Sequence, residues 1–88
     1  MLKYCKNNGE EIQFMPCKNF MSKHLRKGMW YVDSIISTNP PLKILSITRR
    51  NVYGTPLKRL DMECQTINGQ IVQTELYSEE SITTVNPI

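Results

Sequence analysis

Cysteine and histidine are scarce in this 88-residue sequence, which has three cysteines and a single histidine. None of them forms the close Cys-x-x-Cys or His-x-x-x-His pair that pre-forms half of a tetrahedral zinc site. An odd number of cysteines also argues against a disulfide framework, so Cys5, Cys17 and Cys64 are expected to be reduced thiols in a cytoplasmic protein. We therefore expect neither a metal nor a cofactor.

The sequence also lacks the parts of a catalytic site. Its one histidine, His24, has only Asp33 and Ser34 as companions, and their spacing matches no triad. The four glycines are each isolated at a predicted turn, so no glycine-rich loop is present to hold a phosphate. We expect the protein not to be an enzyme.

Long hydrophobic runs are absent. No apolar stretch approaches the roughly 18–20 residues that cross a bilayer, and the first residues do not open a signal peptide, so no membrane partner is expected. The hydrophobic fraction of 40% still provides a small core. We predict one domain over residues 1–88, with a hairpin and helical segment in residues 1–28 and a β-barrel-like core in residues 29–86.

Lysine and arginine are absent after Arg59. Residues 1–59 hold all 11 bases against three acids, a net charge of +8, whereas residues 60–88 hold five acids and no base. Such asymmetry can mark an electrostatic docking surface. The alternative is that the acidic strands pair with basic neighbours in the sheet, which the usual adjacency of sequential strands favours slightly.

The clearest structural signal is a hairpin in residues 57–77, where two alternating runs flank an Asn-Gly turn. A three-residue loop with Gly69 in the left-handed position keeps one face of the hairpin apolar, which a two-residue loop does not. This register pairs Leu60 with Leu76, Met62 with Thr74 and Cys64 with Val72.

The same register places Asp61 opposite Glu75 on the outer face, where like charges cost stability. Three explanations are open: a base from a neighbouring strand lies between them, they hold a cation, or the register is wrong. We favour a base, such as Arg49 or Lys43.

A second hairpin is predicted near the N-terminus, again with a three-residue x-Asn-Gly loop. It pairs Leu2 with Phe14 and Tyr4 with Ile12, sets Lys6 opposite Glu10, and is expected to end at Pro16. Residues 18–27 then show the spacing of one helical face at Phe20, Met21, His24 and Leu25. With Asn19 as a possible N-cap and Gly28 at its end, this segment is predicted to be a short basic helix or a helical turn.

The rest of the chain is predicted to form mostly strands. Residues 29–37 and 42–48 are β-branched and aromatic, with a bulge expected near Asp33 and Ser34. A helical turn at residues 78–81, capped by Ser78, precedes a last short strand at residues 82–85. From Met29 onward, this order of elements resembles the Src-homology-3-like small barrels, such as Tudor and KOW modules, in layout only.

The predicted fold class is therefore mainly β, or β-rich α+β. We expect a small antiparallel Src-homology-3-like barrel or curled sheet, carrying an N-terminal hairpin and one short basic helix. An open antiparallel sheet with one helix packed on it is the competing architecture.

The predicted function is that of a small non-catalytic binding module, with nucleic acid (RNA or a single strand) bound on a basic face. The candidate residues are Lys18, Lys23, Arg26 and Lys27 on the predicted helix, and Arg49, Arg50, Lys58 and Arg59 around the Tyr53 loop. Together they allow some four to six phosphate contacts, and Tyr53 and Tyr31 could stack on unpaired bases. The competing interpretation is that these bases only keep a small surface soluble.

The alternative function is a protein–protein interaction module: an adaptor, or an inhibitor docking on a larger complex, as many viral and mobile-element accessory proteins are. Its expected anchors are Met29 and Tyr31, if the fold leaves them exposed, because such side chains dominate interface energetics. Trp30 is expected in the core instead.

Overall fold

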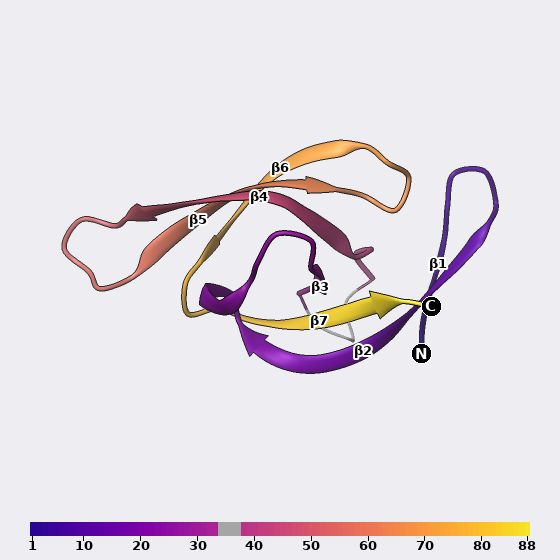
Figure 1. Ribbon diagram of the computed structural model, residues 1–88, viewed down its shortest axis with the longest axis horizontal. Helices are drawn as coiled ribbons and strands as arrows, with labels where there is room; N and C mark the ends of the chain where they lie inside the picture. The colour runs from indigo at the N-terminus through magenta and orange to yellow at the C-terminus, as the bar shows by residue number, and fades with distance from the viewer. Residues whose placement is uncertain (34–37) are drawn as a thin grey trace.

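The structure is a computed structural model that describes residues 1–33 and 38–88. Over these residues the chain forms one antiparallel sheet of seven strands in the order β1-β2-β7-β3-β4-β5-β6, strongly curled into a half-barrel (Figure 1). The strands are β1 (Leu2–Cys5), β2 (Glu11–Met21), β3 (Trp30–Val32), β4 (Leu42–Asn51), β5 (Lys58–Gln65), β6 (Ile71–Tyr77) and β7 (Ser81–Pro87). The mainly β prediction is confirmed, in its curled-sheet form.

Both predicted hairpins form with the predicted registers. In the β5–β6 hairpin, Leu60 pairs with Leu76, Met62 with Thr74 and Cys64 with Val72. Gly69 has a φ of +84°, the left-handed conformation that the three-residue loop requires. In the β1–β2 hairpin, Leu2 pairs with Phe14 and Tyr4 with Ile12.

The short helix predicted at residues 18–27 is wrong, and only its alternative, a helical turn, forms. β2 continues through Pro16 to Met21 because β7 lies beside it and supplies ladder partners up to Ser81. The register shifts between Pro16 and Lys18, so Pro16 stands beside a bulge, where its missing N–H is tolerated. Only a 3-10 turn, η1 (Ser22–His24), remains, and the described residues contain no α-helix.

Ser22 begins η1 and is fully buried. Its hydroxyl donates to the Tyr77 carbonyl and accepts from the Glu80 N–H at 3.2 Å, which ties η1 to the β6–β7 turn. That turn is not the predicted helical turn, and Ser78 does not cap it: the Ser78 hydroxyl accepts from the Lys58 N–H at 3.1 Å. The short strand predicted after it is longer, Ser81–Pro87.

The strand predicted at residues 29–37 is described only as β3 (Trp30–Val32). The bulge expected at Asp33 and Ser34 lies partly outside the described residues. A bulge is found in β4: Ile44 pairs with Cys64 and Ser46 with Glu63, which leaves Leu45 as the extra residue. Because of this extra residue, Ile44 and Ile47 face the same side of the sheet although they are three positions apart. Ile44 is buried in the core, and Ile47 packs against it.

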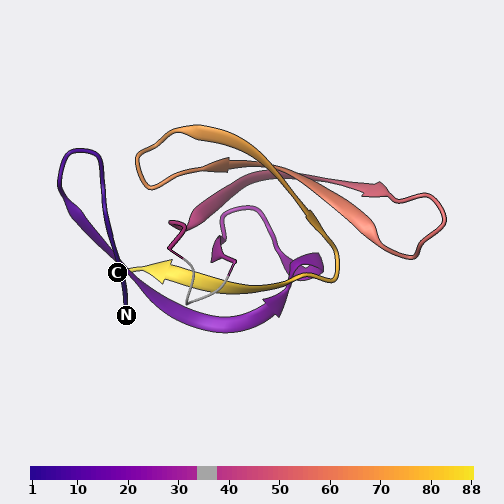
Figure 2. The same ribbon diagram turned by 180° about the vertical axis from the view of Figure 1, so that it is seen from behind.

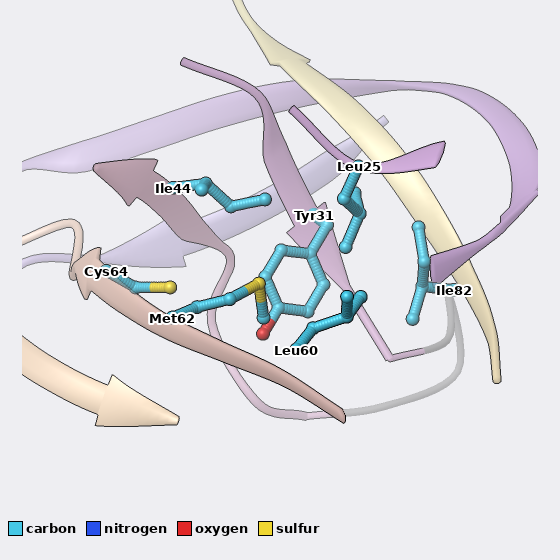
Figure 3. Close-up of a cluster of buried hydrophobic side chains, with 7 residues drawn as sticks. All are labelled: Leu25, Tyr31, Ile44, Leu60, Met62, Cys64 and Ile82. Atoms are coloured by element: carbon cyan, nitrogen blue, oxygen red, sulfur yellow. The ribbon is translucent and has the colours of Figure 1, made fainter. Parts of the chain in front are cut away.

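The first of two hydrophobic clusters lies inside the curl. It consists of Leu25, Tyr31, Ile44, Leu60, Met62, Cys64 and Ile82. Figure 3 shows the Tyr31 ring pointing from β3 toward Met62 and Leu60 of β5. Leu25 belongs to this cluster and has no exposed surface, so it anchors the loop after η1 to the core.

The second cluster consists of Phe14, Val32, Ile67 and Val85 and holds the ends of the sheet together. Ile67 comes from the β5–β6 loop, and the neighbouring Asn68 accepts a hydrogen bond of 2.7 Å from the Asn7 N–H of the β1–β2 loop. The two outer hairpins of the sheet thus meet at one end, as both ribbon views show (Figures 1 and 2).

Thiol labelling tests whether Cys64 is buried in the core. Cys5 and Cys17 are exposed, whereas Cys64 is buried and burial raises its pKa to about 11. We expect the native protein to react rapidly with two equivalents of a thiol reagent at neutral pH, and with the third only in denaturant, because the thiolate is the reactive form. Cys64→Ser, which should still label twice, is the control; three rapid equivalents in the native state would contradict the packing.

Candidate nucleic-acid interface

Three cations converge on one surface hollow between the loop after η1 and strand β4. Arg26, Lys27 and Arg49 line this hollow of about 490 Å³. The uncharged part of its wall is formed by Leu25, Leu45, Ser46 and Ile47. The hollow therefore brings together residues of both predicted basic groups: Arg26 and Lys27 from the segment predicted as a helix, and Arg49 from the group around the Tyr53 loop.

Backbone hydrogen bonds hold the loop against β4. The Gly28 N–H donates to the Ile44 carbonyl at 2.8 Å, and the Ile44 N–H donates to the Met29 carbonyl at 2.9 Å. The Met29 N–H closes a turn on the Arg26 carbonyl at 3.2 Å. These bonds, with Leu25 in the core, fix the backbone that carries Arg26 and Lys27.

Arg49 is fixed from the other side. It pairs with Leu60, so it projects on the core side of the sheet, where its Nη2 donates to the Leu25 carbonyl at 3.0 Å. Across residues 1–33 and 38–88, no carboxylate oxygen lies within 4.0 Å of the cationic groups of Arg26, Lys27 or Arg49. The hollow thus presents positive charge that no neighbouring acid neutralises.

Arg50 and Arg59 lie on the opposite, outer face. The Arg50 Nε donates to Asp61 Oδ2 at 2.7 Å, and the Arg59 Nη2 donates to the same oxygen at 3.2 Å. The Arg59 Nε lies 3.0 Å from Asp61 Oδ1, an ion contact without hydrogen-bond geometry, and 3.8 Å from Glu75 Oε2. The positive charges of Arg50 and Arg59 are therefore balanced by the negative charges of Asp61 and Glu75.

The register that sets Asp61 opposite Glu75 is confirmed, and bases do lie between them. The bases are Arg50 and Arg59, so naming Arg49 or Lys43 was wrong. The reason is the extra residue in β4, which turns Arg49 to the core side of the sheet and Arg50 to the outer side.

This network predicts a pH dependence of stability. Partial desolvation alone would raise the pKa of Asp61, but the hydrogen bonds from Arg59 and Arg50 outweigh it and lower the pKa. The stabilisation is therefore complete above the unfolded pKa of about 3.9 and is lost as the pH falls through the lower folded pKa. In urea titrations, Asp61→Asn should be less stable than wild type at neutral pH and equal to it in strong acid. Glu79→Gln, an exposed control, should not differ from wild type; a constant deficit for Asp61→Asn at every pH would contradict the network.

The β4–β5 hairpin extends beyond the core as an arm, here residues 49–59, visible at the left of Figure 1. Its tip carries Tyr53, whose side chain is fully exposed. Lys58 is also exposed and pairs with Asn51 across the arm. Arg49, at the base of the arm, links it to the hollow.

Two further candidate bases lie outside the hollow. Lys18 is exposed on β2, with its Nζ 5.1 Å from the centroid of the Phe20 ring. Lys23 is exposed in η1, and its backbone N–H donates to the Ser78 carbonyl at 3.0 Å. Neither lines the hollow.

The aromatic residues of β3 are packed inward. Tyr31 is 3% exposed, and burial raises the pKa of its hydroxyl. Met29 is half-buried against the first cluster, and the Trp30 ring lies 5.1 Å from that of Phe14. Tyr31 thus has no open ring face for a base and is not exposed as an anchor, whereas the core position expected for Trp30 agrees with its contacts.

Two participants were missed by sequence reasoning: the Leu25 carbonyl, which orients Arg49, and Ser46, which lines the hollow. A backbone acceptor leaves no trace in a sequence. The apolar residues around Ser46 interrupt the strict alternation of apolar and polar side chains, and this interruption was the feature of the sequence that could have indicated the bulge.

Within the part of the chain that the structure describes, no three potential ligands among His, Cys, Asp and Glu group as a metal site. No helix there has the length and apolar character to cross a membrane.

No family model matches the chain, and neither curated proteins nor solved structures provide a match.

Proposed function

We propose that the protein binds nucleic acid, RNA or a single strand, on the surface formed by the hollow and the arm. The observation that carries this proposal is the convergence of Arg26, Lys27 and Arg49 on one hollow without a neutralising carboxylate. Guanidinium and ammonium groups in such a setting are suited to phosphate oxygens.

The arm adds a second kind of contact. Lys58 supplies one more cation, and the exposed Tyr53 ring offers a stacking face that any unpaired base can use. Duplex DNA offers no such base, so single strands and loops are the preferred ligands. Lys18 and Lys23 act only as peripheral charges, and Arg50 and Arg59 contribute little because Asp61 and Glu75 engage them.

We also propose that the curled sheet is a variant of the Src-homology-3-like barrel. Its support is the order of the five strands from β3 to β7; the helical turn expected before the last strand does not form. The functional proposal does not depend on this relationship.

The test is a titration of labelled single-stranded RNA, single-stranded DNA and duplex DNA at low and physiological salt. About four phosphate contacts predict a slope of log affinity against log salt near −3 for a single strand. The variant Arg26→Gln/Lys27→Gln should weaken binding by about tenfold or more at low salt. Tyr53→Ala should also weaken it, and Tyr53→Phe should not, because stacking needs only the ring.

The matched control is Lys3→Gln/Lys6→Gln, which removes the same charge from the β1–β2 hairpin. It should change binding much less than Arg26→Gln/Lys27→Gln does. No binding at low salt, or an equal loss from both double variants, would overturn the proposal; the first outcome would leave docking on a larger protein as the surviving alternative.

A further inference from the structure

Strand β6 is an edge of the described sheet with little of the usual protection, since Glu75 is its one charged residue. It is seven residues long, contains no proline, lysine or arginine, and pairs with β5 without a bulge. The opposite edge consists of β1, which is only four residues long and carries an exposed lysine, Lys3, and of the rest of β2, which carries Pro16 and Lys18. Proteins shield long edge strands because their free backbone groups can pair with another strand, so an unshielded edge indicates a partner.

The hydrogen-bond pattern shows which residues of β6 direct their backbone groups away from β5. The Thr66 N–H donates to the Gln70 carbonyl, and the Ser78 N–H donates to the Lys58 carbonyl. Hydrogen-bonded pairs alternate in an antiparallel ladder, so residues 72, 74 and 76 bond to β5 while Ile71, Gln73 and Glu75 direct their N–H and C=O outward.

At Tyr77 the outward groups are already used. Its N–H donates to Glu80 Oε2 at 2.6 Å, and its carbonyl accepts from the Ser22 hydroxyl. The open part of the edge therefore ends before Tyr77. Beside its second half lies a hollow of about 460 Å³, with Thr74, Glu75 and Leu76 on one side and residues of β3 and the start of β4 on the other.

The side chains of β6 are arranged symmetrically about Thr74. On the outer face, Ile71 is 53% and Tyr77 is 44% exposed, large values for apolar side chains three residues to either side of Thr74. Between them, Gln73 and Glu75 are exposed, also at equal distances from Thr74. On the inner face, half-buried Val72 and Leu76 complete the pattern.

We propose that two copies of this chain associate through β6, antiparallel, about a twofold axis at Thr74. Gln73 of one copy then pairs with Glu75 of the other, and each of these two pairs exchanges two backbone hydrogen bonds. Ile71 contacts Tyr77 of the second copy, and Val72 meets Leu76. The Gln73 amide, which also donates to Glu63 Oε2 of its own copy at 3.2 Å, lies opposite the Glu75 carboxylate of the other copy.

A second copy fits this edge better than an unrelated strand because each side chain meets a suitable partner only when the sequence is its own, reversed. The interface is isologous and closes on itself. Among the described strands it leaves the short β1 edge and the outer side of β2 beyond Phe14 unpaired in each copy, and it joins two half-barrels into one continuous sheet. The ladder is short, so association in the micromolar to submillimolar range is expected.

Sedimentation equilibrium across that concentration range tests the proposal. Wild type should show a monomer–dimer equilibrium, and Gln73→Pro should weaken it at least tenfold. Proline is tolerated at position 73 because that N–H points away from β5, so circular dichroism and the melting temperature should stay close to wild type. A monomeric wild type at all concentrations would overturn the proposal.

Two charge variants then test the register. Ile71→Lys/Tyr77→Lys places like charges opposite each other and should abolish the dimer, whereas Ile71→Lys/Tyr77→Glu places opposite charges there and should retain it. Equal dissociation of both variants, or a dimer unaffected by Gln73→Pro, would show that the copies associate elsewhere.

Discussion

Replacing Phe14 with alanine should lower the free energy of unfolding by about 3–5 kcal/mol, the usual cost of deleting a buried phenylalanine ring. Phe14 has no exposed surface and lies at the centre of the second cluster. Its ring contacts the rings of Tyr4, at a centroid distance of 6.0 Å, and Trp30, at 5.1 Å. Because small domains have only about 5–15 kcal/mol of stability, this variant should lose a large share of it and unfold at a clearly lower denaturant concentration than wild type.

The measurement is chemical denaturation followed by Trp30 fluorescence, since that indole packs on the replaced ring. Phe20→Ala is the matched control: Phe20 lies on the same strand but is only half-buried, so a clearly smaller loss is expected. Equal losses for the two variants would show that the second cluster contributes less than its packing implies.

Replacing Ile67 with alanine should cost about 2–5 kcal/mol, an effect that is unusual for a loop residue. Ile67 is 8% exposed and inserts from the β5–β6 loop among Phe14, Val32 and Val85. The side chain joins two hairpins at opposite ends of the strand order, so its loss removes a contact that the sheet ladder cannot replace.

Ile71→Ala, a few residues away and 53% exposed, should change monomer stability by less than about 0.5 kcal/mol. Hydrogen exchange adds a second measurement: in Ile67→Ala the amide of Asn7 should lose protection, because its acceptor, Asn68, is no longer held in place. Unchanged protection there would mean that the loops meet independently of Ile67.

The two hairpins could be predicted from sequence because their signals are local and agree with each other. An Asn-Gly turn needs a residue with positive φ, and the alternation on both sides allows only one loop length that keeps the apolar face intact. Gly69 and the pairs beside it met both conditions.

The helix was mispredicted because its signal was local and its competitor was not. Phe20, Met21, His24 and Leu25 have helical spacing, but β7, more than fifty residues later, pairs with residues as far as Met21. A distant strand that satisfies the backbone and buries Phe20 outweighs the weak preference of a ten-residue segment.

Sequence reasoning pointed to the bases of the candidate site but not to how they divide between the faces. Arg49 and Arg50 are neighbours with similar chemistry, and yet Arg49 reaches the hollow while Arg50 pairs with Asp61. That division depends on the β4 bulge, whose position follows from packing against β5 and from no single residue type.

The bulge absorbs Leu45 without altering the pairs on either side of it. If Leu45 were deleted, Ile44 could still pair with Cys64 and Ser46 with Glu63, now in a regular ladder. Arg49 would keep its place on the core side with Leu60, and Arg50 would still face Asp61. The partner strand thus dictates which charge each side of β4 displays, so a one-codon change of length at this point is expected to leave the display intact.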